Sequence, residues 1–119
     1  MLWRSGITET ATGSGLSDSE SSSHSHDAIQ PLFPLGQIVA TSGALTALER
    51  ASQTATELLR PHLAGDWGSL DAHDIAENEY SLAHGFRLLS SYRTTAGERV
   101  WVITEADRSI TSLILPEEY

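Results

Sequence analysis

The stretch from Pro61 to Asp74, PHLAGDWGSLDAHD, gathers residue types that perform acid–base chemistry or hold metal ions. It places two histidines, three aspartates and a tryptophan within fourteen residues, and His84 follows soon after. An imidazole beside a carboxylate can act as a general base, and several such groups together can bind a metal ion. Either chemistry requires that the chain bring these side chains to one place.

A shared metal ion is excluded for most of these groups by their spacing. His73 and His84 are predicted on one helix, eleven residues or ~16 Å apart along its axis. His62 and Asp66 are four residues apart, but Gly65 between them favours a helix stop. Because a zinc site needs three or four ligands in one shell, we expect no metal and no cofactor.

Covalent catalysis has no recognisable motif in this chain. There is no cysteine, no G-x-S-x-G nucleophile elbow, no P-loop and no dinucleotide fingerprint in the predicted folded part. Glu77 and Glu79 point apart on a helix, so they do not form a carboxylate pair. We therefore expect no catalytic residue, although a small hydrolase using His62 or His84 with an aspartate stays open as a third hypothesis.

Three residues of the opening stretch remain without a simple local role. His62, Asp66 and Trp67 lie around two glycines, and a tight turn pinned by a buried Trp67 explains that pattern without a ligand. We keep these three residues as one half of a candidate functional cluster.

The other half is a set of arginines in the C-terminal part of the chain. Arg87 and Arg93 share strand parity, and Arg99 is expected across a hairpin from Arg93. Surface ion pairs with Glu98 or Glu105 explain these positions nearly as well. The candidate recognition residues of this segment are Arg87, Arg93, Arg99 and Arg108.

Composition limits the partners and the setting. The formal net charge is −9 and lysine is absent, so we do not expect direct nucleic-acid binding, which usually rests on several Lys/Arg contacts with phosphates. The N-terminus has no apolar leader and the sequence has no apolar run of membrane-span length. Together with the missing cysteines, these features predict a soluble cytoplasmic protein that has no membrane contact.

The chain is expected to hold one folded unit behind a tail. Residues 1–30 form a Ser/Gly-rich acidic segment that we predict to be disordered, and its His24 and His26 could chelate a metal only loosely. Pro31 and Pro34 mark the boundary, which leaves residues 31–119 as a single small domain.

Three helices are expected between residues 42 and 84. The first spans residues 42–51 with Thr41 as its N-cap. The second opens with a capping box from Thr54 to Glu57 and should be short, or kinked near Arg60, because Pro61 follows. The first helix is expected to bury Ala44, Leu45, Leu48 and Ala51.

The third helix carries the strongest local signals. Asp71 is a predicted N-cap with Asp74 at the third helical position, Leu70 and Ile75 fit a hydrophobic staple, and Gly85 fits a C-terminal stop. Its expected apolar stripe consists of Ala72, Ile75, Ala76, Leu82 and Ala83.

Strands are expected at both ends of the folded part. GQIVAT at residues 36–41 predicts a short strand, and the C-terminal third predicts three more, at residues 86–93, 99–104 and 109–115. The fold class is therefore α+β: a short N-terminal strand, three helices packed on one face, and a C-terminal three-stranded antiparallel meander.

Four blocks carry a resemblance to known sequences: GQIVAT-SGAL, HLAGDWGSLDAHD-AEN, HGFRLLSSY and RVWVITEADRSITSLILPEEY. From residue 33 to the end, the chain resembles a family of small uncharacterised bacterial proteins of plasmids and integrative elements, often labelled plasmid-related protein or type I restriction endonuclease subunit M. The resemblance implies that the gene belongs to a mobile element, a setting that can include restriction or other defence genes. It implies no assigned activity. The subunit M label would mean an amino-methyltransferase, which needs an Asn/Asp-Pro-Pro-Tyr/Phe motif. This chain has no Pro-Pro, and its only asparagine, Asn78, is followed by Glu79, so the label does not fit as an activity.

The leading functional prediction is a non-enzymatic accessory protein of a mobile genetic element that acts through contacts with a protein partner of unknown identity. The alternative is an acidic anti-defence inhibitor, directed against restriction or CRISPR systems, whose seven acids between residues 42 and 84 imitate nucleic acid.

Overall fold

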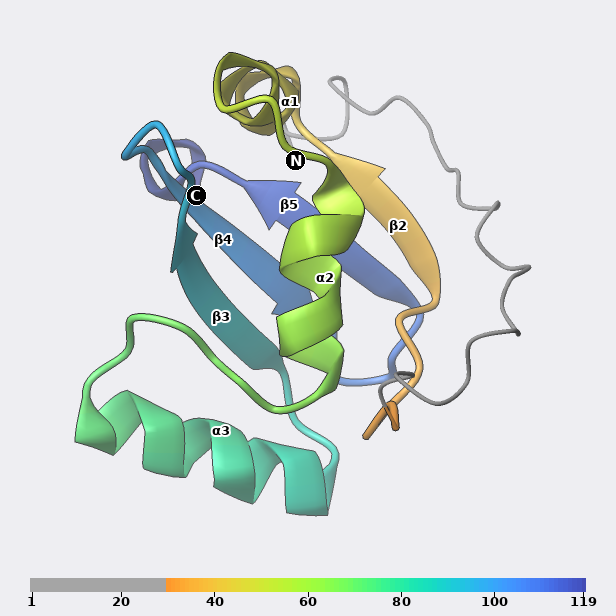
Figure 1. Ribbon diagram of the computed structural model, residues 1–119. Helices are drawn as coiled ribbons and strands as arrows, with labels where there is room; N and C mark the ends of the chain where they lie inside the picture. Colours follow the sequence, from red (N-terminus) through yellow and green to blue (C-terminus); the bar gives the residue numbers. More distant parts are fainter. Residues whose placement is uncertain (1–29) are drawn as a thin grey trace.

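Figure 1 shows the protein as a computed structural model, which describes residues 30–119. The predicted N-terminal tail, with His24 and His26, lies outside the described residues except for Gln30. In the described part of the chain, no helix is long and apolar enough to cross a membrane.

One mixed sheet organises the described residues. Its strands lie in the order β2 (Gln37–Ala40), β5 (Ile110–Ile114), β4 (Arg99–Thr104) and β3 (Leu88–Arg93). The β3–β4 and β4–β5 pairs are antiparallel, whereas β2 runs parallel to β5. The 3₁₀ helix η4 (Pro116–Glu118) follows β5.

The α+β class with three helices is confirmed, but the predicted arrangement of the strands is partly wrong. The N-terminal strand is not separate from a three-stranded meander, because it completes a four-stranded mixed sheet beside β5. Parallel neighbours need a long crossover, and the three helices and two strands between β2 and β5 supply it. Periodicity along the chain shows where strands form but not which strands pair.

Helices α1 (Ser42–Arg50) and α2 (Ala55–Leu63) pack on one face of the sheet (Figure 1). Thr41 caps α1 as predicted, since its side chain accepts a hydrogen bond from the Ala44 N–H at 3.0 Å. The predicted burial of Leu45 is wrong, because that side chain is 38% exposed and Ala47 is buried instead. The helices and the sheet share a core of Ala40, Ala44, Ala47, Leu48, Leu58, Leu59, Tyr92, Val100, Val102 and Leu113.

Helix α2 begins as predicted and is short, with nine residues. The Glu57 carboxylate accepts a hydrogen bond from the Thr54 N–H at 3.3 Å, which forms one arm of the capping box. Pro61 lies inside the helix, which continues through this residue to Leu63. Burial of Leu58 and Leu59 against the sheet offsets the hydrogen bond that the proline cannot donate.

Helix α3 (Ala72–His84) has the predicted ends but not the predicted packing. The Asp71 carboxylate accepts from the Asp74 N–H at 2.8 Å, and Gly85 ends the helix at a φ of 76°. Most of the predicted apolar stripe is wrong: among the thirteen helical residues only Asn78 is buried, and Ile75 is 38% exposed. Figure 1 shows why, since α3 lies beside β3 and not over the face that α1 and α2 cover. Leu82 alone of the predicted stripe is half-buried, where it packs against a core cluster.

The free edge of β3 is closed by two short contacts. The Ser91 N–H donates to the Trp67 carbonyl at 3.0 Å, and the Ser69 N–H donates to the Ser91 carbonyl at 2.7 Å. Two residues earlier in β3, the Asn78 carboxamide donates to the Leu89 carbonyl at 2.7 Å and accepts from the Leu89 N–H at 3.1 Å. Edge groups that would otherwise be unpaired are therefore satisfied inside the chain.

Gly68 makes the first of these contacts possible, and we predict that Gly68→Ala destabilises the protein. A Cβ at Gly68, whose φ is 80°, would lie 2.1 Å from the Ser91 carbonyl oxygen. Gly97→Ala is the matched control, because Gly97 has a φ of 94° and nothing within 4 Å of an added Cβ. In urea unfolding, the control should lose ~1–2 kcal/mol from the positive φ alone, and Gly68→Ala a further ~1–3 kcal/mol from the clash. Equal losses would contradict this account of the β3 edge.

Candidate functional site

His62 lies in the core and forms part of a chain of hydroxyl groups. Its Nδ1 is 2.6 Å from the Ser90 hydroxyl and its Nε2 is 2.9 Å from the Thr104 hydroxyl. Thr104 contacts Thr111 at 2.8 Å, and Thr111 donates to the Leu35 carbonyl at 2.7 Å. Because a carbonyl only accepts, Thr104 must donate to Thr111 and accept from Nε2–H of His62. The Ser90 hydroxyl then donates to Nδ1, so a neutral imidazole satisfies the whole chain.

The surroundings of His62 favour this neutral form. The residue is 0% exposed, and burial lowers its pKa from 6.5 to about 4, with a smaller contribution from the positive charge of Arg108. The rings of Phe33 and Trp67 meet the imidazole edge-on, at centroid distances of 5.2 and 5.8 Å. His62 therefore links α2 to the sheet as a buried structural group.

The hydrolase hypothesis required an imidazole hydrogen-bonded to a carboxylate inside a pocket. Both ring nitrogens of His62 contact hydroxyl groups instead. His84 is exposed, its Nδ1 lies 2.9 Å from the Tyr80 carbonyl, and its ring stacks on the Tyr80 ring at 4.1 Å. The two histidines thus lie in places that provide no general base beside an aspartate.

Trp67 and Asp66 form a turn that supports the fold. Trp67 is 3% exposed, and its indole N–H donates to the Glu79 carboxylate at 2.8 Å. The Asp66 carboxylate accepts from the Gly68 N–H at 3.2 Å, and its carbonyl accepts from the Tyr92 hydroxyl. The structure thus brings His62 and Trp67 together in the core, while Asp66 stays exposed at the turn.

Arg108 is separate from the other three candidate arginines. Its guanidinium donates to the carbonyls of Phe86 and Glu105 at 2.7 and 3.1 Å, and it lies 5.7 Å from the centre of the Phe33 ring. A further bond of 3.4 Å reaches the Ser81 carbonyl in α3. Arg108 therefore ties the end of α3 to the β4–β5 turn and has a structural role.

The remaining arginines lie along β3 and β4. Arg93 is directly opposite Arg99, as the hairpin predicted. Arg93 is exposed and donates to the Gly97 carbonyl at 2.9 Å, whereas half-buried Arg99 donates to the Ser91 hydroxyl at 2.8 Å. Arg87 precedes β3, pairs with Glu105 at 3.5 Å and donates to the Tyr119 hydroxyl.

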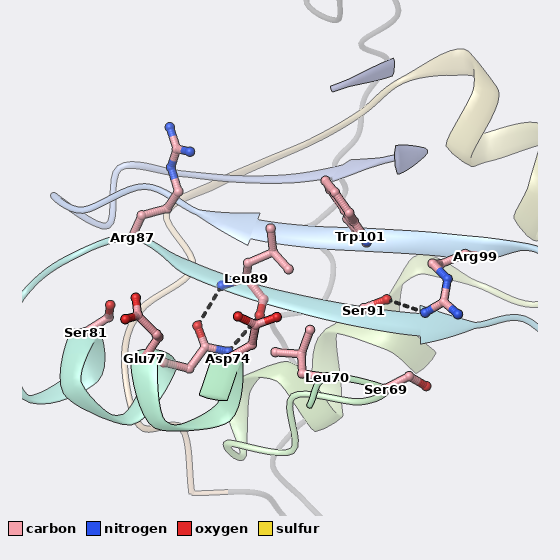
Figure 2. Close-up of a pocket in the computed structure, with 11 residues that line it drawn as sticks. Ser69, Leu70, Asp74, Glu77, Ser81, Arg87, Leu89, Ser91, Arg99 and Trp101 are labelled. Atoms are coloured by element: carbon pink, nitrogen blue, oxygen red, sulfur yellow. Dashed lines mark hydrogen bonds between the residues drawn. The ribbon is translucent and has the colours of Figure 1, made fainter. Parts of the chain in front are cut away.

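Arg87 and Arg99 belong to a pocket between α3 and the strands β3 and β4 (Figure 2), which we call the α3 groove. Its volume is about 530 Å³. Leu89, Ser91, Arg99 and Trp101 alternate with the core residues of their strands, so the groove lies on the sheet face opposite α1 and α2. The groove is lined by Ser69, Leu70, Asp74, Glu77, Asn78, Ser81, Arg87, Leu89, Ser91, Arg99 and Trp101.

The α3 groove has opposite charges on its two walls. Asp74 and Glu77 rise from α3 toward the strands, and Arg87 and Arg99 lie toward opposite ends of the strand wall (Figure 2). Of these residues, the sequence predicted only the arginines as recognition groups. The acids are one helical turn apart, which marks them as neighbours, but their position across from β3 depends on the contact between Asn78 and Leu89.

Three groups in the described residues are close enough to share a metal ion. Single ligand atoms of Asp71, His73 and Asp74 lie within 4.8 Å of one another, and all three residues are exposed. The Asp71 carboxylate already accepts the N-cap bond of α3. An exposed cluster at a helix N-terminus is explained by capping, so we assign no metal to it.

The lowered pKa of His62 predicts a pH-dependent loss of stability. Between about pH 4 and pH 6.5 the imidazole of the unfolded chain binds a proton and that of the folded protein does not. The contribution of His62 to the free energy of unfolding is therefore fully present above pH 6.5 and declines as the pH falls toward about 4. The shift corresponds to about 3 kcal/mol in the free energy of unfolding.

Urea unfolding of the wild type and of His62→Gln between pH 7 and pH 4 tests this prediction. Titration of the carboxylates and of the other histidines is common to both proteins, so their difference isolates His62. The advantage of the wild type should shrink steadily below pH 6.5, and parallel stability curves would contradict a buried neutral imidazole.

Comparison of the chain with protein-family models, with curated proteins and with solved structures found no match. The resemblance of residues 33–119 to plasmid-related proteins therefore stays a prediction. The α3 groove and its charges are the basis for a functional proposal.

Proposed function

We propose that this protein is a non-enzymatic binding module that acts through protein–protein contacts and holds a segment of its partner in the α3 groove. The observation that carries the proposal is the groove itself, about 530 Å³ in volume, with acids on the helix wall and arginines on the strand wall. The resemblance to plasmid-related proteins supports placing this module among the accessory proteins of mobile genetic elements.

The lining of the groove suits a protein segment. Pockets of about 300–1,000 Å³ hold ligands well, and arginine and tryptophan are enriched where proteins contact each other. Arg99 and Trp101 lie on the same face of β4, and both are half-buried. Arg99 therefore offers a charged group at the groove, and Trp101 offers an aromatic surface. Polar side chains around a small apolar centre are typical of transient protein contacts.

A second candidate is the acidic anti-defence inhibitor, and one observation favours it. Asp71, Asp74 and Glu77 follow one another at three-residue spacing in and before α3, and all are exposed. This row supports imitation of a phosphate backbone, whereas Arg87 and Arg99 across the groove weaken the uniform negative field that such imitation needs. The first proposal uses both walls of the groove and is therefore preferred.

Site-specific photo-crosslinking in a native host tests the proposal. A crosslinking amino acid at Ser69, an exposed residue of the groove lining, should capture a defined protein on illumination. The matched control places the same amino acid at Thr56, an exposed residue of α2 outside the groove lining. Identical products from both positions, or none from Ser69, would contradict a partner in the groove.

The same experiment separates the two candidates through charge variants. If the partner binds both walls, Arg99→Gln should reduce the Ser69 crosslink by about tenfold, the loss expected for a charged contact worth ~1.4 kcal/mol. If α3 imitates nucleic acid, Arg99→Gln should strengthen capture, because it removes a positive charge from an anionic surface. DNA or RNA added before illumination would then also compete with the chain and reduce the capture.

A further inference from the structure

We infer that the α3 groove recognises an extended peptide segment that carries a carboxylate close to a cationic side chain, with the carboxylate on Arg99 and the cation facing Asp74 and Glu77. This inference rests on the proposed function and specifies its ligand. It follows from four features of the groove as the described residues form it: an arginine without an acidic partner, two acids without an arginine partner, a half-buried aromatic residue in the lining, and an edge strand that is already closed.

Arg99 has unused capacity to bind an anion. Its NH1 donates to the Ser91 hydroxyl at 2.8 Å, but among the described residues no carboxylate lies within 4.0 Å of its guanidinium. Arg50 and Arg87, in contrast, have Glu98 and Glu105 at 2.7 and 3.5 Å. Because a guanidinium has five N–H donors in a planar fork, half-buried Arg99 is suited to hold a carboxylate through two parallel bonds.

Asp74 and Glu77 provide the opposite charge on the other wall. They are three residues apart on α3, a rise of ~4.5 Å, and both point toward the strands (Figure 2). Their ion contacts in the described part of the chain are with His73, at 3.5 and 3.9 Å. No arginine among the described residues forms an ion pair with either acid, so both can accept a lysine or arginine side chain from a ligand.

Trp101, Leu89 and Leu70 form the apolar part of the groove lining. All three residues are half-buried, so they retain surface that a ligand can cover. The aliphatic stem of a lysine or arginine packs well on an indole, and its charged end remains free to reach a carboxylate. A cationic side chain thus gains both an apolar and an ionic contact in the groove.

The closed edge of β3 determines how the segment is recognised. Leu89 and Ser91 already use their outward-facing backbone groups in bonds with Asn78, Trp67 and Ser69. A peptide cannot extend the sheet there by strand addition, so its side chains must provide the recognition. A uniformly acidic segment would be repelled by Asp74 and Glu77, and a uniformly basic one by the arginine wall, which leaves a mixed-charge segment.

The test is a ¹H–¹⁵N NMR titration of the full-length labelled protein with three capped tetrapeptides: acetyl-Lys-Ala-Glu-Ala-amide, acetyl-Lys-Ala-Lys-Ala-amide and acetyl-Glu-Ala-Glu-Ala-amide. The mixed-charge peptide should shift the indole N–H of Trp101 and the amide of Ser69 with saturation, and at least about tenfold more tightly than either uniform peptide. Equal binding by a uniform peptide, or no saturable shift with the mixed one, would overturn the inference.

Variants on β3 and β4 locate the site. Arg99→Gln should weaken binding of the mixed-charge peptide by about tenfold. Arg99→Lys retains the charge without the planar fork, so its affinity should lie between those of the wild type and Arg99→Gln. Arg93→Gln is the matched control, because Arg93 lies directly opposite Arg99 but does not line the groove. Unchanged affinity in Arg99→Gln, with its dispersed spectrum intact, would contradict the assignment.

The outcomes also separate this inference from the proposed function. If the Ser69 crosslinker captures a partner while the mixed-charge peptide shows no preference, the proposed function stands and the ligand chemistry is wrong. If the peptide binds in the groove but Ser69 captures no protein in the host, the charge placement is right and the function as a protein-binding module fails.

Discussion

The hydrogen bonds that close the free edge of β3 hold the groove side of this structure together. Trp67 and Ser69 pair with Ser91, and the carboxamide of Asn78 pairs with Leu89 in both directions. Without these bonds, an edge strand would present unpaired backbone groups to solvent and to other chains. With them, α3 is fixed beside β3 although Asn78 is its only fully buried residue. Polar contacts of Asn78, together with the partly buried side chain of Leu82, position this helix beside the α3 groove.

A second polar system stabilises the opposite face. His62 joins α2 to β3 and β4 through Ser90 and Thr104, and the hydroxyl of Thr111 continues the chain to the Leu35 carbonyl. Every donor in this chain has an acceptor when the imidazole is neutral, so the buried polar groups cost little. The histidine that looked most suited to catalysis is therefore a structural residue. The proposed binding of a partner takes place instead at the α3 groove, where charged side chains remain accessible.

The sequence predicted local features well because the groups that form them are close in the chain. The caps at Thr41 and Asp71 and the stop at Gly85 each depend on residues within a few positions, and all three formed. Most of the predicted stripe of α3 was wrong, and the sequence did not predict a partner for the first strand, because both features depend on distant neighbours. An amphipathic pattern indicates that a face can be buried, but tertiary packing decides whether it is. For the site, strand parity and hairpin register placed Arg93 opposite Arg99 in advance.

The position of α3 next to the strands tests this account most directly, and the side chain of Asn78 reports it. In ¹H–¹⁵N and NOE spectra of the full-length protein, the Asn78 carboxamide protons should show NOEs to the backbone of Leu89 and exchange slowly with water. These features should persist in high salt, because the contact is a neutral hydrogen-bonded pair. Carboxamide protons that exchange at the rate of a free side chain, without NOEs to Leu89, would contradict the closed edge and the α3 groove.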